Sequence, residues 1–71
     1  MIYSIVILDY RLGEVRVYHF NRFNKPEDPE AWVKGHDKEW KESQCYFMCG
    51  ESLNVRYMDN KTGECLMEEY L

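Results

Sequence analysis

The chain lacks the features of membrane, exported and disulfide-rich proteins. Its apolar run at residues 5–8 is far shorter than the roughly 20 residues that cross a bilayer. Residues 1–4 carry no basic region and no cleavage-type site. An odd count of three cysteines is a poor disulfide framework; they are Cys45, Cys49 and Cys65. We therefore expect a cytoplasmic protein without a membrane partner, whose thiols act as small buried hydrophobes.

Catalytic and cofactor motifs are also missing. The four glycines are isolated, so no glycine-rich loop is available for a phosphate, and no serine stands in a Gly-x-Ser-x-Gly context. His19 and His36, the two histidines, lie in no motif with a nucleophile and an orienting acid. A chain this short has little room for a pocket of roughly 300–1,000 Å³. We expect a non-enzymatic protein that binds no cofactor.

Two sets of candidate metal ligands fail on spacing. Cys45 and Cys49 would lie about 13 Å apart on one face of a strand, which is too far to share a zinc ion. Four carboxylates at two turns could attract a hard cation, but neither turn has EF-hand spacing and each contains a basic residue. They are Asp9, Glu14, Asp59 and Glu64. We predict no metal site.

The charge and the size of the chain limit which binding partners and which domain organisation we expect. The net charge is −4 and the pI is about 5.0, which makes nucleic acid an unexpected partner. The charge is uneven: residues 1–25 hold four bases and two acids, whereas residues 26–71 hold five bases and eleven acids. An apolar share of 45% indicates a packed core, and 71 residues make one domain. Domains this small bury only about 60% of their unfolded surface and often self-associate.

Alternating apolar residues predict strands at residues 2–10 and 15–20. The first is apolar on both faces, which is typical of an inner strand. Asp28-Pro29-Glu30 is a strong helix start, and Gly35 favours a stop, so a short helix is expected at about 29–35. A continuation to Trp40 stays open. Further strands are predicted later in the chain, at 44–49, 53–58 and 64–68.

These elements predict one α+β domain over residues 1–71. The expected order is β-β-α-β-β, with room for a fifth strand at the end. Two antiparallel hairpins and one short helix would pack on a single sheet. This arrangement would bury the apolar faces of the strands under the helix.

A turn sequence occurs twice, fifty residues apart. Residues 9–14 and 59–64 both have the pattern Asp-x-basic-x-Gly-Glu, and the flanking apolar positions also match. An Asp side chain accepts bonds from turn amides ahead of it, and Gly adopts the left-handed conformation that joins two strands. The repeat predicts two hairpins of the same kind. Whether it reflects turn chemistry alone or an internal duplication around the helix stays open.

The basic and aromatic stretch after the first turn is the candidate ligand surface. Its residues are Arg16, Tyr18, Arg22, Phe23 and Lys25. Cations beside aromatic platforms suit single-stranded nucleic acid, provided that Arg16 and Tyr18 lie on the outer face of their strand. In the alternative, Tyr18 and Phe20 pack under the helix, and the arginines pair with the acidic half of the chain.

The opening of the chain resembles a group of short uncharacterised bacterial proteins. The resemblance rests on Leu8-Asp9-Tyr10 and Gly13-Glu14-Val15, a strand that leads through a turn into a second strand, with Tyr18 following. The helix around Trp32 and the strand from Cys45 to Met48 are similar in layout. The group carries no assigned activity, so the resemblance implies a hairpin opening and a cytoplasmic protein of a bacterium or a mobile element, but no site.

The function that fits these observations best is a small protein-interaction module, with an unknown protein or a second copy of the chain as partner. Binding would use an exposed strand edge or the acidic surface. The alternative is single-stranded nucleic-acid binding through the basic and aromatic stretch.

Overall fold

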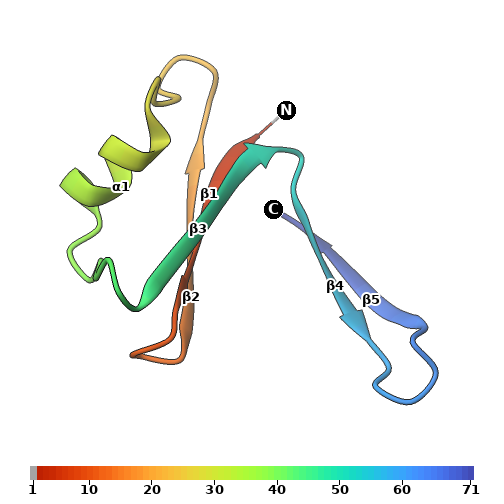
Figure 1. Ribbon diagram of the computed structural model, residues 1–71. Coiled ribbons are helices and arrows are strands. Elements are labelled where there is room, and N and C mark those ends of the chain that lie inside the picture. The colour runs from red at the N-terminus through yellow and green to blue at the C-terminus, as the bar shows by residue number, and fades with distance from the viewer. Residues whose placement is uncertain (1) are drawn as a thin grey trace.

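A computed structural model describes residues 2–71, which form five strands and one helix (Figure 1). They are β1 (Tyr3–Asp9), β2 (Glu14–Phe20), α1 (Pro29–His36), β3 (Cys45–Glu51), β4 (Asn54–Met58) and β5 (Cys65–Tyr70). Each lies within two residues of its expected bounds. The α+β class is confirmed, and the fifth strand is present.

The strands form two sheets, so the prediction of a single sheet was wrong. Sheet A has the order β2-β1-β3 with both pairings antiparallel, and β4 and β5 form a separate antiparallel hairpin. The cause lies between β3 and β4. Ser52 has a left-handed backbone with a φ of 56°, and this residue redirects the chain out of sheet A.

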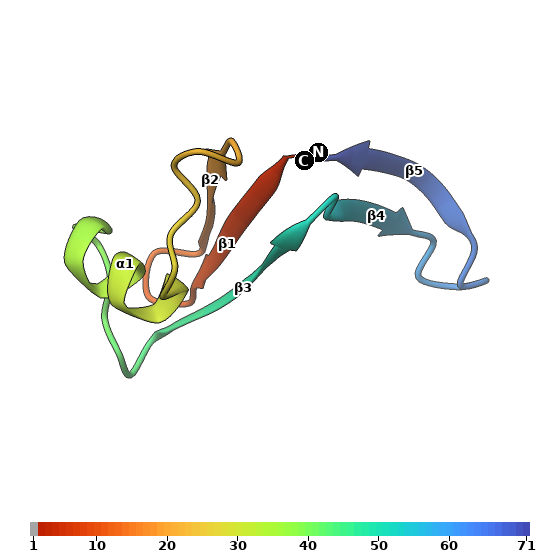
Figure 2. The same cartoon turned by 90° about the horizontal axis from the view of Figure 1, so that it is seen from above.

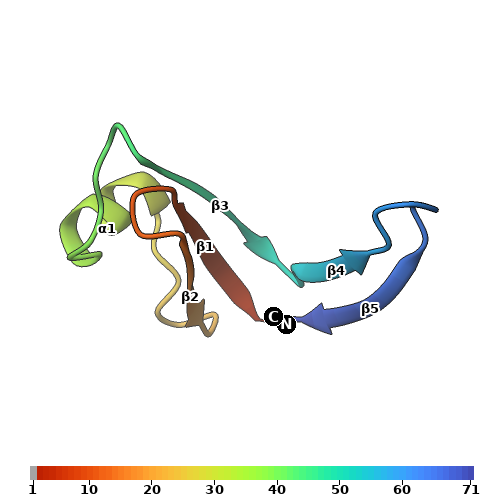
Figure 3. The same cartoon turned by 90° about the horizontal axis from the view of Figure 1, so that it is seen from below.

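Hydrogen bonds show how the chain passes this kink. The Ser52 N–H donates to the Ile2 carbonyl at 3.1 Å, and the Leu71 N–H donates to the Leu53 carbonyl at 2.9 Å. β3 and β4 thus behave as one bent strand, paired with β1 on one side of the kink and with β5 beyond it. The two sheets diverge from the kink as the arms of a V, seen from above in Figure 2 and from below in Figure 3.

The helix begins as expected and ends one residue later. Asp28 caps it by accepting a hydrogen bond from the Ala31 N–H at 3.2 Å. At the other end the Asp37 N–H donates to the Val33 carbonyl at 2.9 Å. Gly35 therefore lies inside the helix and does not terminate it. No helix within residues 2–71 is long and apolar enough to cross a membrane.

The two kinds of glycine in this fold should respond oppositely to alanine. Gly35→Ala is expected to stabilise the protein by up to about 1 kcal/mol, because an added Cβ meets nothing within 4 Å and alanine is the better helix former. Gly13→Ala should destabilise it, because Gly13 has a φ of 65°. Thermal unfolding of both variants measures this contrast. A loss of stability in Gly35→Ala would contradict it.

The core lies between α1 and one face of sheet A. Its buried side chains come from the three strands of sheet A and from the helix; they are Tyr3, Ile5, Ile7, Phe20, Val33 and Cys45. Trp32 packs over them, with its ring centroid 4.9 Å from those of both Tyr18 and Phe20. Edge-to-face contacts of this kind add to the burial energy of the rings. In Figure 1, α1 lies against sheet A on the side away from the β4–β5 hairpin.

The repeated turn is confirmed in geometry. A carboxylate oxygen of Asp9 accepts the Arg11 and Leu12 N–H groups at 3.0 Å, and one of Asp59 accepts the Thr62 N–H at 2.9 Å. The glycines of both turns have positive φ. The hairpins differ elsewhere, because α1 covers only sheet A and a register shift interrupts the β4–β5 pairing. They are not arranged symmetrically around the helix.

Candidate interaction surface

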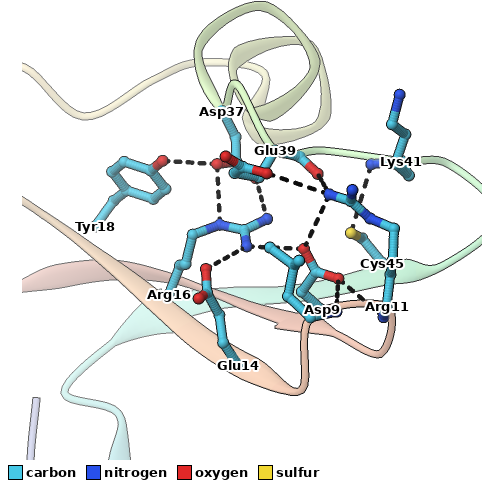
Figure 4. A network of polar contacts seen from close by, with 10 residues as sticks. Asp9, Arg11, Glu14, Arg16, Tyr18, Asp37, Glu39, Lys41 and Cys45 are labelled. Carbon is cyan, nitrogen blue, oxygen red and sulfur yellow. Dashed lines mark hydrogen bonds and ion pairs between the residues drawn. The ribbon is translucent and has the colours of Figure 1, made fainter.

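The densest polar cluster of the protein centres on Arg16 (Figure 4). Its guanidinium donates to Asp9 at 2.8 Å and to the two carboxylate oxygens of Asp37 at 2.8 and 3.1 Å. It also donates to Glu14 at 2.8 Å, and the Tyr18 hydroxyl donates to Asp37 at 2.8 Å. These bonds join the first hairpin to the residue that ends α1.

The electrostatics of this cluster are those of a structural contact. Hydrogen bonds from Arg16 hold the pKa of Asp9 below its usual range, and the carboxylates in turn raise the pKa of Arg16. Burial, followed by the contact with Asp37, raises the pKa of the Tyr18 hydroxyl. Arg16 and Asp9 are therefore fully charged at neutral pH. Neither is poised to transfer a proton, which argues against a general acid or base here.

The residues of the predicted ligand surface divide into two groups. Arg16 and Tyr18 face α1, and the Arg16 side chain is only 15% exposed. Arg22 and Phe23 lie in the following loop, where the Arg22 guanidinium stands 4.8 Å from the Phe23 ring. Lys25 stands 4.7 Å from the Tyr3 ring and 3.8 Å from the Glu51 carboxylate. The structure does not bring the five together as one platform.

The orientation of β2 explains this outcome. Arg16 and Tyr18 were expected on the outer face, but they share the helix-covered face with Phe20. The alternative, in which these aromatic residues pack under the helix and the arginines pair with acidic residues, describes this strand better. Tyr18 and Phe20 pack under α1, and Arg16 pairs with Asp37. Val15 and Val17 consequently point to the other side of sheet A.

That other side of sheet A is mainly apolar and, apart from the buried Ser4 near the kink, largely open to solvent, and we call it the uncovered face. Alternation places every second residue of each strand on it, and cross-strand partners share it. On the central strand, Leu8 is 41% exposed; on β2, Val15 is 61% exposed; on β3, Met48 is 56% exposed. Tyr46 continues the face and packs edge-on against Tyr10, with ring centroids 5.7 Å apart.

The uncovered face forms one wall of a groove inside the V. The β4–β5 hairpin forms the other wall, and the volume between them is about 480 Å³. The groove is lined by Val6, Leu8, Val15, Val17, Val55, Tyr57, Glu69 and Leu71. Seven of these eight side chains are apolar or aromatic. An exposed, contiguous apolar surface of this kind marks a binding site more often than an inert surface.

The cysteines and histidines do not gather into a reactive site. Cys45 is buried in the core as expected, whereas Cys49 and Cys65 are exposed. His36 stacks on Trp32 and its Nδ1 lies 2.8 Å from the Trp32 carbonyl. Within residues 2–71 no group of three or more His, Cys, Asp or Glu side chains is placed to hold a metal ion.

The sequence also contains a signal for the groove. Residues 2–10 are apolar on both faces, which predicted an inner strand, and this prediction is confirmed because β1 is the central strand of sheet A. The helix α1 does not cover the second face, where Leu8 is exposed, Val6 is half-buried and Ser4 near the kink is buried. When a strand is apolar on both faces and a helix packs on only one of them, the other face is a candidate binding surface.

Neither a protein-family model, nor a curated protein, nor a solved structure matches this chain. The function must therefore be inferred from the arrangement of its own side chains. Of the surfaces described above, the groove is the one whose chemistry suits binding.

Proposed function

We propose that this protein is a non-enzymatic protein-interaction module that binds a protein partner in the groove. The observation that supports the proposal is the row of apolar side chains on the uncovered face, of which Leu8, Val15 and Val17 line the groove and are exposed in the structure of residues 2–71. Burial of apolar area is the main driving force of protein association. A surface of β-branched, leucine and aromatic side chains is suited to another protein, and the Tyr57 hydroxyl and the Glu69 carboxylate are the polar side-chain groups among its lining residues.

The acidic surface is a weaker candidate than the groove. Many of its carboxylates already have partners within the chain. Lys34 pairs with Glu30 at 2.9 Å and with Glu42 at 3.3 Å, and Arg11 pairs with Glu39 at 3.2 Å. A basic partner would have to compete with these contacts for a surface that is also screened by salt.

A charge placed in the groove should abolish binding. Leu8→Lys puts an ammonium group in the centre of the uncovered face, whereas Leu66→Lys puts it on β5, outside the groove lining. Tagged wild type, Leu8→Lys and Leu66→Lys serve as matched baits in the native host. We expect the wild type and Leu66→Lys to retain the same protein and Leu8→Lys to lose it at least tenfold, as judged by mass spectrometry.

The tryptophans provide the control for folding. Trp32 and Trp40 pack on the helix side of sheet A, so their fluorescence reports the core and not the groove. A Leu8→Lys protein with wild-type tryptophan emission has kept its fold. Identical retention by all three folded baits would contradict the proposal.

A further inference from the structure

We infer that the occupant of the groove is a second copy of this chain, packed about a two-fold axis so that each copy covers the other's uncovered face. This inference rests on the proposed function, whose site it shares, and it names the partner. It follows from the size of the exposed apolar surface, from its lack of charge and from the isolation of the β4–β5 hairpin.

The charge of the groove favours an identical partner. Glu69 is the one charged residue among the eight that line it, and no Lys or Arg lines it. A basic or acidic partner segment would therefore find almost nothing to pair with. The same surface on a second copy is equally apolar. Glu69 is exposed in a single chain, and two copies must therefore meet so that this carboxylate keeps its contact with water at the rim of the interface.

The area of the two walls of the groove approaches the area that a stable dimer buries. The two walls have a flat footprint of about 500 Å², because sheet A has three strands of seven residues and the hairpin has strands of five and six residues. Side-chain relief raises the accessible area above that figure, toward the roughly 800 Å² that each partner buries in a stable interface. A footprint of this size falls in the upper part of the range for the largest apolar patch on a typical monomer, about 300–600 Å², and such patches are often functional.

The stability of the chain also favours a permanent partner. Six hydrophobic side chains are buried among residues 2–71, which is a small core for a chain of this length. A two-stranded hairpin is marginally stable by itself, and every residue of β5 is exposed. A second copy is present wherever the first is, so it can cover both walls at all times.

Sedimentation equilibrium of the full chain tests the inference directly. The chain has a mass of 8.6 kDa, and we expect twice that mass for the wild type and for Leu66→Lys at micromolar concentrations and above. Leu8→Lys should sediment as a single chain with unchanged tryptophan emission. A single-chain mass for the wild type up to millimolar concentration would overturn the inference, and so would a dimer that survives Leu8→Lys in a folded protein.

Methionine oxidation of the wild type decides the question if Leu8→Lys does not fold. Neither methionine is among the eight lining residues, but Met48 lies on the uncovered face as the cross-strand partner of Val6, whereas Met58 lies on the hairpin. Both are about half exposed in one chain, at 56% and 46%. We expect Met48 to become protected at least fivefold as concentration rises, while Met58 reacts at a constant rate. Equal rates for the two at all concentrations would overturn the inference.

The two proposals can fail separately. A wild-type protein that is monomeric, and that retains a different host protein in a Leu8-dependent way, refutes self-pairing and supports the interaction module. A Leu8-dependent dimer supports both. A monomer whose capture does not depend on Leu8 refutes both.

Discussion

Arg16→Ala is expected to destabilise the protein by about 3–5 kcal/mol, because it leaves the buried Asp37 without a counter-charge and the buried Asp9 with only the more distant Arg11, at 3.9 Å. The side chains of these two aspartates are 0% and 2% exposed. The loss is comparable to the whole stability that a core of this size supplies. Urea unfolding monitored by tryptophan fluorescence should therefore show an unfolded or barely folded variant in dilute buffer.

A second arginine provides the control for this prediction. Arg56 also pairs with a carboxylate, that of Glu68 at 3.6 Å, but both side chains lie at the surface. Exposed pairs contribute little, because water solvates the separated charges almost as well. Arg56→Ala should leave the unfolding curve nearly unchanged. Equal losses from the two substitutions would mean that the Arg16 cluster is not a buried network.

The Arg16 cluster should also make stability depend on pH in the acid range. Arg16 holds the pKa of Asp9 below its ordinary value, so the folded state favours the ionised carboxylate. This contribution is complete above about pH 4 and is lost as the pH falls through the lowered pKa of the folded state. A protein that keeps its full stability down to pH 2 would contradict the assignment.

Ile7→Ala is expected to cost about 3 kcal/mol, within the usual range for removing a large aliphatic side chain from a core. Ile7 is fully buried on the central strand of sheet A, between Arg16 on β2 and Phe47 on β3. The cavity would lie directly beneath α1, where the surrounding side chains are fixed by three strands. The free energy of unfolding in urea measures the loss.

Leu66→Ala is the matched control, since it removes an aliphatic group of the same size from a side chain that is 68% exposed on β5. We expect a change within about 0.5 kcal/mol, which is usual for a surface substitution. Comparable losses for Ile7→Ala and Leu66→Ala would show that Leu66 is buried in solution. In that event the β4–β5 hairpin is covered on its outer side as well.

Local chemistry made several features predictable from the sequence. The cap at Asp28, the proline at Pro29 and the two Asp-to-Gly turns are stabilised by contacts within a few residues, so their patterns could be recognised directly. Strand positions followed from alternation in the same way. These features gave the α+β class, the element order and the repeated turn geometry.

The candidate site was much less predictable. Alternation divides β2 into a face with Arg16 and Tyr18 and a face with Val15 and Val17, but it does not say which face a helix will cover. The usual rule would bury the valines. In this protein the helix brings Asp37 to Arg16 and Trp32 to Tyr18, and that pairing places the valines on the outside.

The sequence by itself determined the elements, because a cap, a turn or a strand depends on neighbours along the chain. Tertiary structure alone decided how the elements meet. The left-handed backbone at Ser52 separated β4–β5 from sheet A, and the contact between Arg16 and Asp37, twenty-one residues apart, selected the covered face. Both outcomes depend on energies that arise only when distant segments pack, and together they leave the apolar groove as the binding surface that we propose.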